Sequence, residues 1–194
     1  MNLSAFARIA VIGCAALVAA CQTTKPAVEK ENLSQEQVRE RRLQVDAIAK
    51  QALERLYAEK PDARAEVEGA AGYGVFDITS INAVMYVGAT GPGVIIDNKT
   101  GHRAYMRAIR AGTGPGVGYQ QLYQIFVFKN KEALEQFRVG DAAGGDVSAS
   151  VTAGTAGVKY SFNPFINVYQ ISEKGFAVQA NWGGTGYVMD PNLN

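Results

Sequence analysis

A run of alternating glycines is the first feature that suggests chemistry. The stretch AGTGPGVGYQ covers residues 111–120, and its glycines are Gly112, Gly114, Gly116 and Gly118. A P-loop needs a lysine directly after its last glycine, and the dinucleotide fingerprint G-x-G-x-x-G needs a helix after it. Here no lysine follows, the spacing is two throughout, and the next segment, YQQLYQIFVF, has the pattern of a strand. Because two is the repeat of a strand, we predict a structural role, a face without side chains that permits close packing or bending.

The sequence offers few groups for catalysis. His102 is the single histidine, and no G-x-S-x-G turn accompanies it, so we interpret it as an ordinary surface residue. Asp141 and Asp146 flank two glycines and suit calcium by type, but their spacing matches no EF-hand loop. We favour a solvated loop there and predict a non-enzymatic protein without cofactor or metal.

One strand-like segment combines guanidinium groups with an aromatic ring. In RAYMR, residues Arg103, Tyr105 and Arg107 alternate onto one face, and Arg110 lies close by with the opposite parity. Two guanidiniums beside an aromatic ring suit phosphate or anionic headgroups. These four residues are our candidate ligand-binding set, and a solvated outer strand face is the alternative.

The N-terminus has the pattern of a signal peptide. Arg8 precedes an uninterrupted apolar run over residues 9–20, a charged head and an apolar body. Twelve apolar residues are too few to span a bilayer as a helix, which takes ~20. We therefore predict a signal peptide over residues 1–20.

The end of this run resembles the lipobox of bacterial lipoproteins. Its letters are VAAC, with the cysteine at Cys21, and VIGC ending at Cys14 also fits the local pattern but leaves a much shorter apolar run. In bacterial lipoproteins the cysteine is acylated and the chain is cut before it. The resemblance implies lipid attachment at Cys21 and, with Gln22 next, a place on the periplasmic face of the outer membrane. More than one acyl chain gives stable anchoring.

The segments after the cysteine divide by composition. Residues 21–33 are polar, contain a proline and lack an apolar period, so we expect a flexible tether. Residues 34–59 have a capping box followed by apolar residues at helical spacing, and a second short helix is expected from Pro61 to about residue 69. Apart from Gly13, every glycine lies at or beyond position 69. We thus predict one domain over 34–194, with a helical part (34–69) and a glycine-rich β part (70–194).

Short strands and turns alternate through the β part. NKTG predicts a hairpin in which Gly101 takes a positive φ, and EKG predicts a last hairpin between INVYQIS and FAVQANW. NKEALEQFRVG predicts a helix that begins after Asn130 and stops at Gly140. No βαβ rhythm is present. The expected fold class is α+β, with one or more N-terminal amphipathic helices packed on a strongly curved, barrel-like, mainly antiparallel sheet.

The order of the glycine-rich segments resembles the SYLF domain. The segments are GYGVF, GPGV, GTGPGVGYQ, the passage from FVF to ALEQF, and DVSASVTAG, within residues 45–190. The resemblance implies lipid binding, notably of phosphoinositides in eukaryotic members, whose membrane-active amphipathic helix corresponds to residues 34–59 here. Acidic residues among the basic ones on that helix weaken a phosphoinositide role, and the actin binding of yeast relatives does not carry over to a periplasmic protein.

These observations lead to two functional hypotheses. The first is a membrane-anchored periplasmic lipoprotein whose SYLF-like domain binds lipid or another hydrophobic or anionic ligand. The second is an envelope scaffold or protein-interaction module with an unidentified protein partner and no small ligand. Nineteen basic and eighteen acidic residues nearly balance, so a nucleic-acid partner has no electrostatic support.

Overall fold

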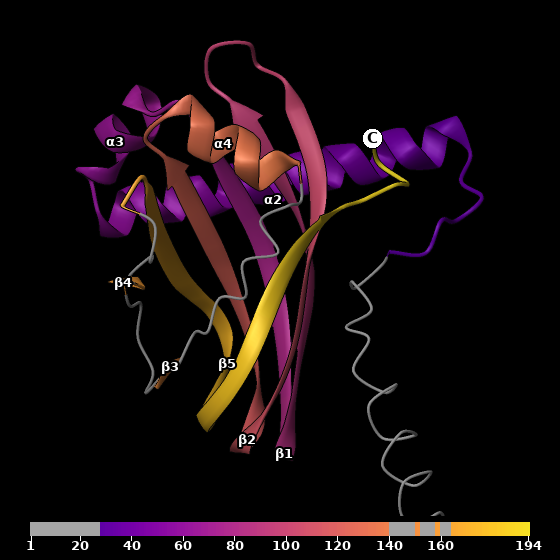
Figure 1. Ribbon diagram of the computed structural model, residues 1–194, viewed down its shortest axis with the longest axis vertical. Coiled ribbons are helices and arrows are strands. Elements are labelled where there is room, and N and C mark those ends of the chain that lie inside the picture. Colours follow the sequence, from indigo (N-terminus) through magenta and orange to yellow (C-terminus); the bar gives the residue numbers. More distant parts are fainter. Residues whose placement is uncertain (1–27, 140–149, 152–157, 160–163) are drawn as a thin grey trace, which may run out of the picture.

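The computed structural model describes residues 28–139, 150–151, 158–159 and 164–194. The helices in these ranges are α2 (Gln35–Glu59), α3 (Ala63–Gly69) and α4 (Lys131–Arg138). The strands are β1 (Gly72–Asp97), β2 (Arg103–Phe128), β3 (Ser150–Val151), β4 (Val158–Lys159) and β5 (Ile166–Met189). The arrangement is α+β, as predicted (Figure 1).

Helix α2 has the predicted start and the predicted packing. The Ser34 side chain accepts a hydrogen bond from the Gln37 backbone N–H, and the Gln37 side chain accepts one from the Ser34 N–H, so the capping box is complete. The fully buried positions of α2 follow helical spacing and contact the sheet; they are Val45, Ala49, Ala52 and Leu56. The apolar face of this helix is therefore covered by its own domain.

The two short helices are close to their predicted places. Helix α3 begins at Ala63, so Pro61 lies before the helix and not in its first turn. The Asn130 side chain caps α4 by accepting a hydrogen bond from Ala133 N–H at 2.9 Å. The predicted stop at Gly140 lies outside the described residues.

The sheet is antiparallel, in the order β1-β2-β5-β3, with β4 also paired to β5. Among the described strands β1 pairs only with β2, so the sheet is not closed and the expected barrel-like closure was wrong. A barrel needs hydrogen bonds between its first and last strands. This sheet instead curves because its long strands bend along their length.

Each of the three main strands is much longer than the sequence pattern suggested. GYGVFDI, AVMYVGA and GVIID form one strand, β1. The predicted EKG hairpin was wrong, because β5 runs through it and pairs with β2 on both sides. The register shifts there, with Leu122 opposite Ser172 and Gln121 opposite Lys174, so the extra residue Glu173 forms a bulge. The NKTG hairpin is confirmed, with Gly101 at a φ of 69°.

Strand β1 bends back until its two halves touch. A Cβ on Gly91 would lie 1.7 Å from the backbone oxygen of Asp77, and one on Gly93 would lie 2.2 Å from the Phe76 ring. Residues 14 to 17 positions apart on one strand are thus in contact, and only glycine permits it at these places. The bend itself falls near Val84, at the end of the sheet away from α2 and α4 (Figure 1).

Each face of the bent sheet carries its own core. On one face, α2 and α3 pack on side chains such as Val75, Val94 and Ile125. On the other face, α4 packs on a cluster of aromatic rings; its members are Phe76, Phe126, Phe128, Phe137 and Tyr187, with centroids 4.8–6.4 Å apart. Both helical layers lie toward the same end of the sheet, so none of the described helices covers the bend at the other end (Figure 1).

Candidate functional site

The predicted arginine face lies on β2 and is occupied by contacts within the protein. Arg103 Nε lies 3.4 Å from Asp46 Oδ1 of α2, and the Tyr105 hydroxyl donates to Asp46 Oδ2 at 3.2 Å. The guanidinium of Arg42 lies 5.5 Å from the centre of the Tyr105 ring. Burial, together with the nearby Asp46 carboxylate, raises the pKa of Tyr105. The Tyr105 side chain and the Arg103 guanidinium therefore hold α2 on the sheet.

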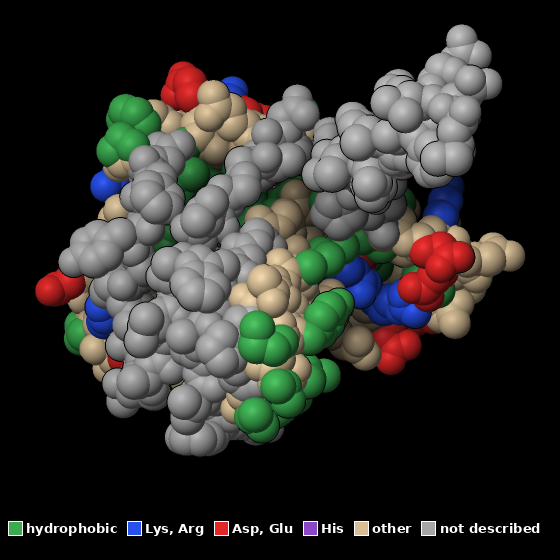
Figure 2. Space-filling view, turned by 60° about the horizontal axis from the view of Figure 1, so that its bottom comes forward, with side chains coloured by type: hydrophobic (Ala, Val, Ile, Leu, Met, Phe, Trp, Pro, Cys, Tyr) green, Lys and Arg blue, Asp and Glu red, His purple; other side chains and the backbone are tan. Residues whose placement is uncertain are grey.

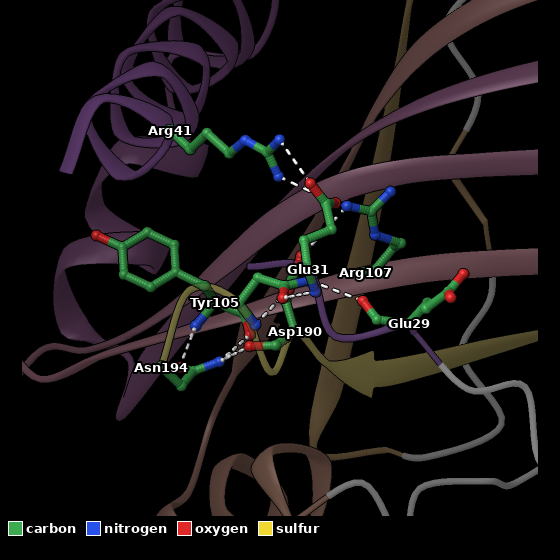
Figure 3. A network of polar contacts seen from close by, with 8 residues as sticks. Glu29, Glu31, Arg41, Tyr105, Arg107, Asp190 and Asn194 are labelled. Carbon is green, nitrogen blue, oxygen red and sulfur yellow. Dashed lines mark hydrogen bonds and ion pairs between the residues drawn. The ribbon is translucent and has the colours of Figure 1, made fainter. Parts of the chain in front are cut away.

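Arg107 belongs to a second set of contacts, which joins the start of the described chain to its end. Its Nη2 lies 3.2 Å from Oδ2 of Asp190, whose side chain is 2% exposed. Asn192 accepts from the Glu31 backbone N–H at 2.7 Å and donates to the Glu29 carbonyl at 3.0 Å. We call this group the C-terminal clasp; its members are Glu29, Glu31, Arg41, Arg107, Asp190, Asn192 and Asn194 (Figure 3).

Further bonds close the clasp around β2. Nη1 and Nη2 of Arg41 donate to the two oxygens of the Glu31 carboxylate, at 3.1 and 2.8 Å. Asn194 bonds to both backbone groups of Tyr105, accepting from its N–H and donating to its carbonyl. Residues 29–31, inside the predicted tether, are thus bonded to the C-terminal segment.

The four predicted ligand-binding residues do not form one surface. Arg103, Tyr105 and Arg107 share a strand face, but two of these three contact Asp46 and the third contacts Asp190. Arg110 lies on the opposite face, in line with the buried Ala108, and burial lowers its pKa. An anionic ligand at this face would compete with carboxylates that are already bound.

The other sequence candidates contribute no chemistry to the described ranges. His102 Nδ1 lies 3.2 Å from Arg138 Nη2 on the surface. Cys21, Asp141 and Asp146 lie outside the described residues. Within the described part of the chain no three His, Cys, Asp or Glu side chains gather in a way that suits a metal ion. No helix there is long and apolar enough to cross a membrane.

A different surface is unusual for its composition. Six large apolar side chains, each 48–69% exposed, lie on two paired strand segments at the bend of the sheet. We call this surface the apolar tip; its members are Ile81, Val84, Met85, Tyr86, Val117 and Tyr119. Figure 2, in which the lower end of Figure 1 is turned forward, shows hydrophobic side chains grouped at the surface there. Grouped apolar exposure of this kind marks an interaction surface more often than scattered apolar residues do.

The pairing between the strands gathers these side chains. Ile81 lies opposite Tyr119, and Ala83 lies opposite Val117. The register then shifts by one residue, so that Gly114 and Pro115 lie together opposite Met85. Before this shift the even-numbered residues of β1 face the aromatic cluster, and after it the odd-numbered ones do. Four consecutive exposed residues, 83–86, lie at the change of parity.

Val84 has a strained backbone at the centre of the tip. Its φ is 58°, a left-handed conformation that is a genuine outlier for a β-branched residue. Such strain concentrates at functional sites. The register shift beside Val84 also argues against pairing of β1 with a strand of another chain, because bulges on an edge strand oppose such pairing.

Sequence reasoning predicted short strands and turns in this region and missed the tip. A signal was present, since no charged residue occurs between Asp77 and Asp97 or between Arg110 and Lys129. Two charge-free strands also fit a fully buried core, and only the bend distinguishes the two cases.

The alternating glycines lie on β2, at the bend. Residues 112–118 are strand and not a phosphate-binding loop, as predicted. The close approaches that the structure describes involve glycines of β1, chiefly Gly91 and Gly93. Tight packing at Gly112, Gly114, Gly116 and Gly118 stays a prediction.

Comparison with known proteins finds one similar curated protein and does not show a family for this chain. The chain is 31% identical over 164 residues to Beta cell expansion factor A of Aeromonas veronii. The aligned region covers 84% of this chain and 62% of that protein, so the chain spans less than two thirds of its relative. No family model matches the chain.

Proposed function

We propose that the protein is a lipid-anchored envelope protein whose SYLF-type domain binds a lipid surface through the apolar tip, without catalysis. The anchor in this proposal is an acylated Cys21, which places the domain on the periplasmic face of the outer membrane. The observation that carries the proposal is the grouped exposure of the six tip side chains.

Energetic arguments favour burial of the tip against an apolar partner. Each Val, Ile or Met side chain contributes about 1.5–3 kcal/mol when fully buried. A millimolar to micromolar affinity corresponds to a binding free energy of about 4–8 kcal/mol, a range that burial of a few such side chains can supply. The two tyrosines fit the same setting, because their rings are apolar and their hydroxyls are polar, which favours a membrane interface.

In this proposal lipid binds to the apolar tip and not to the face that carries Arg103 and Arg107. Arg103 and Arg107 are bound to Asp46 and Asp190, whereas the tip side chains are exposed. The proposal also assigns α2 a packing role, because the apolar face of that helix contacts the sheet. A membrane role for residues 34–59, as in the eukaryotic relatives of the SYLF type, would require the helix to leave its core.

Vesicle co-sedimentation tests the proposal with a pair of matched variants. The protein is residues 22–194, a chain that keeps every described contact. Val117 and Val139 are the same residue type and are 67% and 69% exposed, on the tip and at the end of α4. Val117→Asp should reduce binding strongly, and Val139→Asp should leave it unchanged. Equal binding by the two variants would remove the tip from the proposal.

The same experiment separates lipid binding from the scaffold hypothesis. If residues 22–194 bind no vesicle of any composition, only the acyl anchor remains as a lipid contact. Crosslinking in intact envelopes that captures one saturable protein at the tip would then favour the interaction module.

A further inference from the structure

The surface around the apolar tip lacks charge on every strand that the structure places there. Residues 78–96 of β1 and 111–128 of β2 contain no Asp, Glu, Lys or Arg, and neither do residues 175–189 of β5. At the bend, residues 116–118 of β2 pair with residues 177–179 of β5, so the charge-free segments of the three strands meet there. The nearest charge on β2 is Arg110, which lies on the inner face of the sheet.

Three cations at the opposite end of the sheet face carboxylates. Arg103 contacts Asp46, Arg107 contacts Asp190, and Arg41 contacts Glu31. An ion-paired guanidinium adds little attraction for an anionic surface, because the carboxylate beside it largely cancels its field and salt screens the rest beyond a Debye length. The electrostatic and the apolar features are therefore at separate ends of the same sheet.

We infer that the apolar tip enters the nonpolar part of a bilayer end-on, and that its partner is an electrically neutral phospholipid surface, with no requirement for anionic headgroups. This inference rests on the proposed function and adds the lipid class and the mode of contact. Binding then follows from burial of apolar area, which salt does not screen.

The tyrosines of the tip set the depth of entry in this geometry. Tyr86 lies opposite Thr113, and Tyr119 lies opposite Ile81, so one ring is on each of the two paired strands. Further along the strands, Gln120 and Ser80 are opposite each other and are both buried. The apolar surface therefore ends within a few residues of the bend, and the contact is shallow, at the level where amphipathic rings are favoured.

The test measures flotation of residues 22–194 with vesicles of phosphatidylcholine alone and of phosphatidylcholine with phosphatidylglycerol. Each is measured between about 0.01 and about 1 M salt, over which the Debye length falls from about 30 to about 3 Å. We expect binding to both compositions, with affinities that differ by less than about threefold across the salt range. Val117→Asp should weaken binding about tenfold or more, the effect of losing one buried apolar side chain.

Two controls keep the inference distinct from the proposed function. Arg103→Gln removes a half-exposed cation of the opposite end and should change binding by less than about twofold. Val139→Asp should behave in the same way. Binding that appears only with phosphatidylglycerol and disappears in high salt would overturn the inference and leave the proposed function standing. Absence of binding to both vesicle types would overturn both.

Discussion

The two ends of the bent sheet differ in how their side chains are covered and paired. At one end, three helices cover both faces, and the C-terminal clasp joins residues 29–31 to residues 190–194 through paired charges and amide groups. At the other end, no helix of the described ranges covers the strands as they turn back, and residues 78–96 and 111–128 carry no charge. Val84 is strained there, and six apolar side chains are exposed. The first end has the features of stability and the second has the features of contact with a partner.

The contrast teaches where a change should affect folding and where it should affect binding. At the clasp end the core side chains are buried and the clasp side chains are paired, so the loss of one of these leaves a cavity or an unpaired charge. Side chains at the tip are solvated in the free protein, so their replacement changes the folded state little. A substitution at the tip that lowers stability, or one at the clasp that abolishes vesicle binding, would contradict this assignment of folding to one end and binding to the other.

The largest effect is expected where β1 touches itself. Gly91→Ala places a methyl group 1.7 Å from the Asp77 backbone oxygen, and neither strand half can move without breaking its pairing. We expect a loss of about 3 kcal/mol or more of unfolding free energy, at the upper end for overpacking. Urea denaturation measures it. Gly69→Ala is the control, because nothing lies within 4 Å of the added Cβ; an equal loss in both variants would contradict the close approach.

A smaller effect is expected at the clasp. Asp190→Ala leaves Arg107 without its carboxylate, and the Arg107 side chain is only 33% exposed. Because breaking a buried pair costs about 3–5 kcal/mol and this cation is partly solvated, we expect about 2–3 kcal/mol. Thermal denaturation should show the difference. Glu54→Ala, which breaks the exposed 3.9 Å pair with Lys50, should cost less than about 0.5 kcal/mol.

The tip should respond in the opposite direction. Val84→Asn replaces a β-branched residue at a φ of 58° by one that tolerates this conformation, so we expect a gain of about 1 kcal/mol in stability. The same variant should bind vesicles more weakly, because it removes an exposed apolar side chain. Val117→Asn lacks the backbone strain and should lose binding without gaining stability. Unchanged stability in Val84→Asn would mean that the strain is absent.

The smallest expected effect is on the pH dependence of stability, and it comes from Asp97, at the start of the hairpin between β1 and β2. Asp97 Oδ1 accepts from the N–H groups of Thr100 and Lys99 at 2.8 Å, and these bonds lower the pKa of Asp97. Since the folded pKa lies below the unfolded value of about 3.9, this contribution to stability is complete above that pH and is lost as the pH falls below it. Asp97→Ala should flatten the acid limb of a stability profile; a profile of unchanged slope would contradict the assignment.

Local signals in the sequence predicted the helices and one turn. Ser34 with Gln37, Asn130, and Gly101 each act within a few residues, so their roles are visible in the letters alone. The double length of β1, the bulge at Glu173 and the clasp between Glu31 and Asn192 depend on partners far along the chain, where periodicity carries no information.

The candidate sites illustrate the same limit. The parity of Arg103, Tyr105 and Arg107 predicted a shared face correctly, but the carboxylates opposite them come from α2 and from Asp190. The glycines of residues 112–118 lie at the bend and predicted close packing or bending, but they do not show which side chains the bend exposes. The long absence of charge is the trace of the exposed side chains in the sequence.

The central claim is that the apolar tip, and not the helical end, contacts lipid. An environment-sensitive fluorophore on Val117→Cys or on Val139→Cys, in residues 22–194, which contain no other cysteine, reports it most directly. On addition of phosphatidylcholine vesicles, we predict that the probe at 117 brightens and becomes shielded from aqueous iodide, while the probe at 139 does neither. A probe at 139 that becomes shielded while the one at 117 stays accessible would contradict the account.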